Sequence, residues 1–144
     1  MKSIVLQHQF TVPSTPEAAV SHLMEPSSYV ELNGFVVAVR DIREEGGSTV
    51  YTAIERLPIL WWHFHSPLKV RVRSEEAGTR FIMEVDSHGG VRVRVVTQFT
   101  STPEGAVADD TITLTAPALV RGYSAKQARA GQLHRGQALA VRLS

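Results

Sequence analysis

Hydrophobic and polar residues alternate along much of this chain, with the period of two that is typical of half-buried β-strands. The alternating or β-branched segments are 4–12, 35–42, 48–57, 68–74, 79–85, 91–99 and 106–116. Glycine pairs at Gly46-Gly47 and Gly89-Gly90 indicate hairpin turns between neighbouring segments. The pattern therefore predicts one early strand and a later meander of six strands, with one dry and one solvated face.

Two short helices are predicted between the first strand and the meander. Thr15 can cap the first helix, Pro16 suits its first position, and Glu17 complements the positive end of its dipole. Pro26 ends this helix. Ser27 can cap a second one, and Gly34 can close it.

A longer helix is predicted to begin near Pro117 and to run to the end of the chain. Its apolar stripe recurs at intervals of three, four or seven residues. The stripe is made of Leu119, Tyr123, Ala130, Leu133 and Ala140. Gly122, Gly131 and Gly136 weaken the helix locally.

These elements predict an α+β domain that covers residues 1–144. A sheet with a single dry face must be covered, and the C-terminal helix is the only large element available for this. A seven-stranded antiparallel sheet with strands of this length also curves. A curved sheet wrapped around one helix leaves an apolar hollow between the two, and a ligand could occupy that hollow.

Composition narrows the functional classes. The chain has 144 residues and no cysteine, which excludes disulfides, thiolate metal sites and cysteine catalysis. Fifteen basic and fourteen acidic residues leave almost no net field to support a nucleic-acid partner. The N-terminal residues do not match a signal peptide, and no apolar run approaches a membrane span. We therefore expect a cytoplasmic protein without a membrane span.

The chain contains the stretches VPSTPEAAVSHLMEPSSYVELNGFVVAVRDI and TAPALVRGYSAKQARAGQLHRGQALAVRL. These two stretches resemble the START-like (SRPBCC) helix-grip superfamily, most closely its polyketide cyclase/dehydrase-type branch. The first matches that superfamily's order of strand, capped helix, acidic residue before proline, and aromatic residue before the second strand. The resemblance implies the helix-grip fold, a cavity and the binding of hydrophobic small molecules. It supplies no catalytic set of residues.

The segment LPILWWHFHSP, residues 57–67, contains both tryptophans and two of the six histidines. If it is extended, His63 and His65 point the same way, with Trp61 beside them. We favour a solvated face for the two histidines. A polar lining for the cavity is the next alternative, and a metal site with Glu55 or His134 is the weakest, because no spacing supports it. We expect no metal and no cofactor.

Two other polar features allow a structural and a functional interpretation. Asp110 is expected on the same strand face as the apolar residues Ile112 and Leu114. We favour a position near the open end of the sheet, where the carboxylate stays solvated. The alternative is a desolvated site, in which a raised pKa would let Asp110 act as an acid or base. A series of arginines alternates with valines and is expected on the solvated face, offset by nearby glutamates. The series comprises Arg71, Arg73, Arg80, Arg92 and Arg94.

The favoured function is the binding of a hydrophobic or aromatic small molecule, lipid-, polyketide- or isoprenoid-like, between sheet and C-terminal helix. The predicted ligand-binding residues are Trp61, His63, Val70, Val72, Phe81, Met83, Val93, Val95, Asp110, Ile112, Leu114, Leu119, Tyr123, Gln127 and Leu133. The alternative is a cyclase- or dehydratase-like enzyme, which requires two of Tyr123, His63, His65 and Asp110 to converge. A third hypothesis is a side-chain-filled hollow in a domain that acts through protein contacts, including a homodimer.

Overall fold

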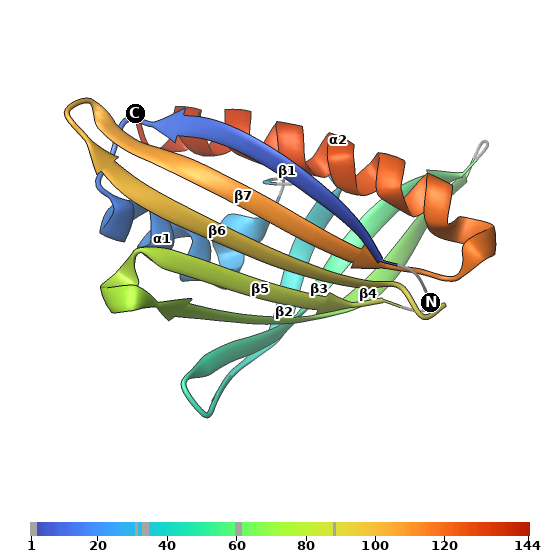
Figure 1. Ribbon diagram of the computed structural model, residues 1–144. Helices are drawn as coiled ribbons and strands as arrows, with labels where there is room; N and C mark the ends of the chain where they lie inside the picture. The colour runs from blue at the N-terminus through green and yellow to red at the C-terminus, as the bar shows by residue number, and fades with distance from the viewer. Residues whose placement is uncertain (1–2, 31, 33–34, 60–61, 88) are drawn as a thin grey trace.

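The computed structural model describes residues 3–30, 32, 35–59, 62–87 and 89–144, and for 57–59 and 62–64 it describes the backbone alone. Within these residues, seven antiparallel strands form one sheet in the spatial order β1-β7-β6-β5-β4-β3-β2 (Figure 1). The strands are β1 (Ser3–Val12), β2 (Val36–Glu45), β3 (Ser48–Ile59), β4 (Trp62–Glu75), β5 (Arg80–Asp86), β6 (Arg92–Thr102) and β7 (Gly105–Thr115). The predicted order of strands is confirmed.

The helices between β1 and β2 follow the prediction in part. Helix α1 (Pro16–Met24) begins where predicted, and the Thr15 hydroxyl accepts a hydrogen bond of 3.2 Å from the Ala18 amide. The predicted second helix is a single 3-10 turn, η1 (Pro26–Tyr29), because the chain is already extended at Val30. The predicted end at Gly34 lies outside the described residues.

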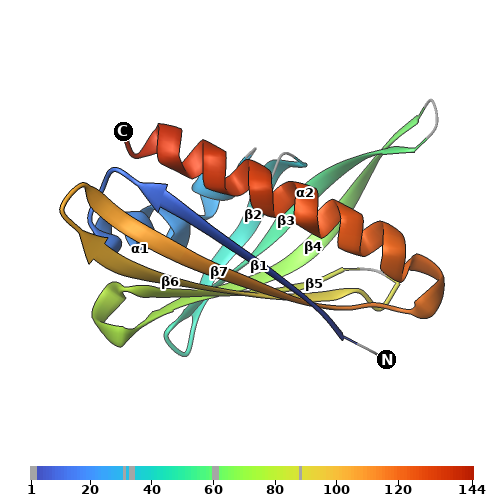
Figure 2. The ribbon, with the colours of Figure 1, turned by 45° about the horizontal axis from the view of Figure 1, so that its top comes forward.

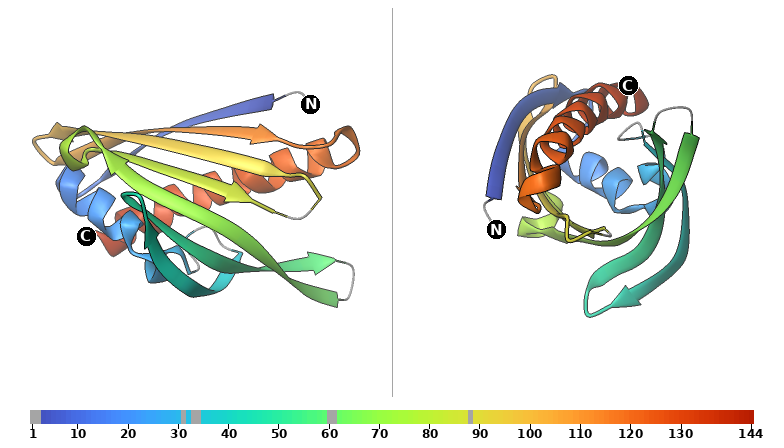
Figure 3. Two further views of the ribbon diagram at one scale, coloured as in Figure 1. Left: turned by 90° about the horizontal axis from the view of Figure 1, so that it is seen from below. Right: turned by 90° about the vertical axis from the view of Figure 1, so that its right-hand side faces the viewer.

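The sheet curves around the helices, as the right-hand view in Figure 3 shows. Helix α2 (Ala118–Arg142) runs across the sheet over β1 and β7 (Figure 2), and α1 contacts β4, β5 and β6. The side chains of Leu68, Val70 and Val72 are buried on the inner face, whereas Lys69 is exposed. The predicted helix-grip arrangement, a curved sheet around a long C-terminal helix, is therefore confirmed.

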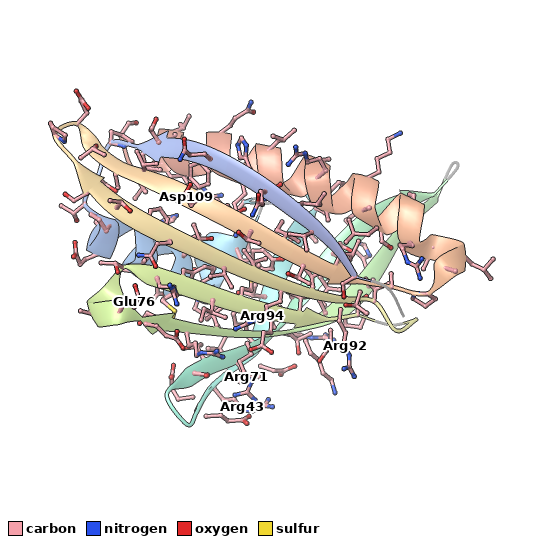
Figure 4. The ribbon with its side chains drawn as sticks, in the orientation of Figure 1. Arg43, Arg71, Glu76, Arg92, Arg94 and Asp109 are labelled. Carbon is pink, nitrogen blue, oxygen red and sulfur yellow. The ribbon has the colours of Figure 1, made fainter. Side chains whose placement is uncertain are left out.

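The outer face of the sheet carries the predicted arginines, of which Figure 4 labels Arg71, Arg92 and Arg94. Four of them form ion pairs with acidic residues on the same or neighbouring elements, and one of these acids lies in the 3-10 turn η2 (Glu76–Gly78). The pairs are Arg71–Glu45, Arg73–Glu75, Arg73–Glu84, Arg80–Glu76 and Arg92–Asp86. Since solvent screens the attraction within these exposed pairs, they contribute little to stability.

The buried face of α2 differs from the predicted stripe. The buried helix residues are Gly131, Gln132, Arg135, Gly136 and Leu139. Leu119 is fully exposed, and Ala130 and Leu133 lie on the exposed side, so the prediction was wrong for these three. The apolar pattern misled because two of the inward residues are polar and two are glycines. No helix among the described residues is both long enough and apolar enough to cross a membrane.

Gly136 allows α2 to lie close against β1. A Cβ atom at this position would be 3.2 Å from two ring carbons of Phe10 and 3.4 Å from Nε2 of His8. Real Cβ atoms rarely approach other atoms so closely, so a larger side chain would force the helix away from the strand. Gly122, in the same helix, has no atom within 4 Å of the corresponding position.

We expect the Gly136→Leu substitution to lower the free energy of unfolding by about 1–3 kcal/mol, because the side chain would overpack the α2–β1 contact. Gly122→Leu is the matched control, and it should raise stability by about 0.5 kcal/mol through better helix propensity. Urea unfolding followed by circular dichroism measures both. Equal effects of the two substitutions would contradict the close packing at Gly136.

Candidate functional site

A cavity of about 320 Å³ lies between the inner face of the sheet and α2. Its sheet wall is mostly aliphatic and comes from β3 to β7, and its helix wall comes from α2, mainly from the first half of that helix. The sheet residues in the wall include Met83, Val93, Val95, Ile112 and Leu114. The residues from the first half of α2 include Val120, Tyr123, Ser124, Gln127 and Ala128. Other lining residues are Tyr29, Glu55, Ser66, Gln132 and Arg135. A hollow of this kind is therefore present among the described residues, contrary to the filled-core hypothesis.

The cavity has an exposed end and a buried end. At one end the cavity is lined by Gly89, Val120 and Tyr123. These three residues are themselves exposed, so this end of the cavity is open to solvent. Tyr29 and Arg135 line the other end, and both are buried. A ligand would therefore enter the cavity near the start of α2 and extend toward the 3-10 turn η1, which contains Tyr29.

Seven of the predicted ligand-binding residues line this cavity. They are Met83, Val93, Val95, Ile112, Leu114, Tyr123 and Gln127. The strand residues among them alternate with outward residues along β5, β6 and β7, and this alternation could be recognised in the sequence.

Six predicted residues, Asp110 among them, lie elsewhere in the described structure. Val70, Val72 and Phe81 are buried in the core under α1, because α1 covers the end of the sheet that the prediction assigned to α2. Phe81 instead borders a small void of about 10 Å³. Leu119 and Leu133 are exposed on α2 and do not line the cavity.

Residues 57–59 and 62–67 form the distal part of the β3–β4 pairing, in which Pro58 is paired with His63 and Ile59 with Trp62. His65 is exposed on the outer face, as favoured, while Ser66 lines the cavity. Trp61 and the side chain of His63 lie outside the described residues. In the described part of the chain, no group of three or more potential ligands could hold a metal ion.

Asp110 occupies the middle of β7, not the open end of the sheet, because the strand begins at Gly105. Its side chain is completely buried and forms an ion pair with Arg135 of α2. The Thr97 hydroxyl donates to Asp110 Oδ1 at 2.5 Å, and Gln132 Nε2 donates to Oδ2 at 3.1 Å. The favoured position for Asp110 was therefore wrong, and its carboxylate is fully engaged behind the cavity wall.

This buried polar cluster extends to β1. Gln132 Nε2 also donates to the Leu6 carbonyl at 3.4 Å, and Arg129 Nη1 donates to the Gln7 carbonyl at 2.9 Å. Only one donor of Arg135, its Nη2 group, has a hydrogen-bond partner among the described residues. Arg135 therefore both holds α2 on the sheet and presents part of its guanidinium group to the inner end of the cavity.

Glu55 is the one acidic side chain among the described lining residues. It is half-buried on the inner face of β3, where Tyr51 and Ala53 precede it on the same face. Burial raises the pKa of its carboxyl group above the usual value of 4.5. No hydrogen bond or ion pair within the described structure engages that carboxyl group. The inward alternation of Tyr51, Ala53 and Glu55 is a sequence signal for this position that the predicted set of residues omits.

Tyr29 lines the inner end of the cavity, and its ring packs edge to face against that of Tyr51, with centroids 6.3 Å apart. Burial, and to a smaller extent Tyr29, raises the pKa of the Tyr51 hydroxyl. The Tyr51 phenol is therefore neutral at physiological pH, and Tyr29 offers an aromatic surface to the cavity.

No protein-family model and no curated protein matches this sequence. Solved structures match its fold. The Zhui aromatase/cyclase from Streptomyces sp. R1128 has a TM-score of 0.76 at 10% identity, with 99% of this chain and 94% of that chain covered. The di-domain aromatase/cyclase StfQ of the steffimycin biosynthetic pathway has a TM-score of 0.70 at 12% identity, with 97% of this chain covered.

This chain spans about half of the StfQ chain, with 51% covered. The protein TTHA0849 from Thermus thermophilus matches with a TM-score of 0.67 at 14% identity, over 99% of this chain and 100% of that one. Identities this low show the fold alone. The chain therefore shares the helix-grip fold of these solved structures.

We expect removal of one partner of the Asp110–Arg135 pair to destabilise the fold strongly. Arg135→Met should lower the free energy of unfolding by about 3–5 kcal/mol, because it leaves a buried carboxylate without its cation. The Asp110→Leu/Arg135→Met double variant should lose less than the sum of the two single variants. Additive losses in urea unfolding would show that the two side chains do not act as a pair.

We expect Glu55→Gln to become increasingly stabilising as pH rises from 4 to 7. The folded protein holds a proton on Glu55 above pH 4.5, where the unfolded chain releases it, so the wild type loses stability as pH rises through this window. Glutamine does not titrate. Urea unfolding at several pH values measures the difference, with Glu104→Gln in an exposed turn as the control. A difference independent of pH would contradict the desolvation of Glu55.

Proposed function

We propose that this chain is one START-like domain that binds a compact hydrophobic or aromatic small molecule in the cavity between the sheet and α2. The observation that carries the proposal is the cavity itself, about 320 Å³ with a mostly aliphatic wall and a few polar groups. Ligand pockets have volumes of roughly 300–1,000 Å³ and the same composition. The volume favours a molecule with a few rings, or a short isoprenoid, over a long-chain lipid.

Several features of the wall support selective binding. Aliphatic side chains from β5 to β7 supply the hydrophobic surface, and burial of a ligand against them contributes roughly 25 cal/mol per Å² of apolar area. Tyr29 at the inner end and Tyr123 at the open end offer aromatic faces. Ser66, Ser124 and Gln127 add neutral hydrogen-bonding groups that can orient a ligand.

The enzyme alternative receives less support. It required two of Tyr123, His63, His65 and Asp110 to converge inside the hollow. Among the described side chains of that set, Tyr123 lines the cavity, His65 lies on the outer face, and Asp110 is engaged by Arg135. The fold is shared with aromatase/cyclases, but the predicted proton-transfer set is not assembled by these three residues. We therefore propose binding as the function.

We expect the neutral dye N-phenyl-1-naphthylamine to bind with an increase in fluorescence, and Ser124→Trp to reduce its affinity at least tenfold. Ser124 lines the cavity on α2, so an indole at this position would occupy the ligand space. Gln137→Trp, on the exposed side of the same helix, is the matched control and should bind the dye as the wild type does.

Native mass spectrometry of freshly purified protein provides a second readout. A co-purified apolar compound that is present in the wild type and in Gln137→Trp, but absent from Ser124→Trp, would support the proposal. Dye binding that is equal in both tryptophan variants would place the dye on the surface. That result, or a wild type that takes up no hydrophobic dye, would overturn the proposed function.

A further inference from the structure

The charge distribution in the cavity wall indicates which polar group a ligand should carry. Two formally charged side chains line the cavity in the described structure, Arg135 and Glu55. The positive charge of Arg135 is already neutralised by Asp110, with which it forms a buried ion pair. Glu55 has no such counter-ion among the described residues. When Glu55 is ionised, the cavity therefore carries one uncompensated negative charge.

Apart from Arg135, whose charge is paired with Asp110, the described lining of the cavity contains no cation that could act on Glu55. Its backbone partners are Val36 of β2 and Ser66 of β4, and its flanking residue Arg56 is exposed on the opposite face of β3. Across the cavity, α2 presents Tyr123 and Arg135, and η1 presents Tyr29. Burial is the sole cause of the raised pKa of Glu55, and no charge from these groups contributes to it.

A carboxyl group buried at this position lowers the stability of the fold, because no hydrogen bond or ion pair in the described structure compensates for its desolvation. A structural role would give Glu55 a hydrogen bond or an ion pair, as Asp110 has in the same molecule. Perturbed, unpartnered ionisable groups in a cavity wall are candidate functional groups, because a ligand can supply the missing partner. The partner that suits a carboxylate in an apolar wall is a cationic hydrogen-bond donor.

We propose that Glu55 is a specificity-determining residue and that the cavity prefers hydrophobic or aromatic amines, whose ammonium group pairs with the Glu55 carboxylate. This inference rests on the proposed function, because it names the class of ligand that the same cavity takes. The aliphatic wall holds the body of the amine, and Glu55 replaces the water that the ammonium group loses on entry. An anionic ligand would face Glu55 without compensation, since Asp110 already neutralises Arg135.

Three naphthalene ligands that differ in one polar group test the proposal: 2-(2-naphthyl)ethylamine, 2-(2-naphthyl)ethanol and 2-naphthylacetate. Isothermal titration calorimetry of the wild type at pH 7 should give the amine a dissociation constant about tenfold lower than that of the alcohol, as a charge-assisted hydrogen bond provides. The carboxylate should bind most weakly. Glu55→Gln should reduce the ratio between amine and alcohol to about one, whereas Glu104→Gln, which changes the net charge equally, should keep the ratio.

The pH profile separates a specific pair from a general charge effect. Amine affinity in the wild type should rise as pH increases from 4.5 toward 7, because Glu55 becomes ionised while the amine stays protonated. The affinity for the alcohol should not rise in this range, and in Glu55→Gln the rise for the amine should be lost.

The outcomes are distinguishable. If neither the amine nor the alcohol binds the wild type, the proposed function fails. If the alcohol binds as tightly as the amine, or the preference survives Glu55→Gln, the proposed function stands and the role of Glu55 is overturned. Tightest binding of 2-naphthylacetate would also overturn it and would identify Arg135 as the selecting group.

Discussion

The buried ion pair between Asp110 and Arg135 is the interaction on which the architecture depends. It joins the middle of β7 to the second half of α2, and Thr97 and Gln132 complete the hydrogen bonding of the carboxylate. A charge buried this completely is tolerated only with its partner in place. The pair therefore determines which face of α2 meets the sheet, even though an apolar pair of the same shape could hold the helix as firmly.

The position of this contact explains why a cavity exists. Helix α2 is held over β1 and β7, where Gly136 permits close approach to Phe10, and α1 fills the curve of the sheet at the other end. Between these two contacts the aliphatic inner face of β5 to β7 lies opposite the first half of α2. That half of the helix has mostly small or polar inward residues, such as Ser124, Gln127 and Ala128, which do not fill the space.

Much of the fold could be predicted from the sequence because strand periodicity is a strong local signal, and the alternation in β5 to β7 identified five lining residues. The prediction of the buried face of α2 was wrong because a pattern of apolar residues cannot reveal that the polar residues Gln132 and Arg135 point inward. Their burial depends on Asp110, 22 or 25 residues earlier in the chain. The inward direction of Glu55 could have been recognised from its alternation with Tyr51. Its lack of a partner could not, because that depends on which groups the folded chain brings near it.

The two halves of α2 differ in what they do besides lining the cavity. Gln132, Arg135 and Leu139 in the second half fix the helix to the sheet, and the first two of them also line the cavity, whereas Ser124 and Gln127 in the first half only border it. Substitutions in the first half can thus alter the shape and chemistry of the cavity at little cost in stability. Natural mutation or protein design could therefore change which molecules the cavity binds, while the contacts that hold the fold remain in place.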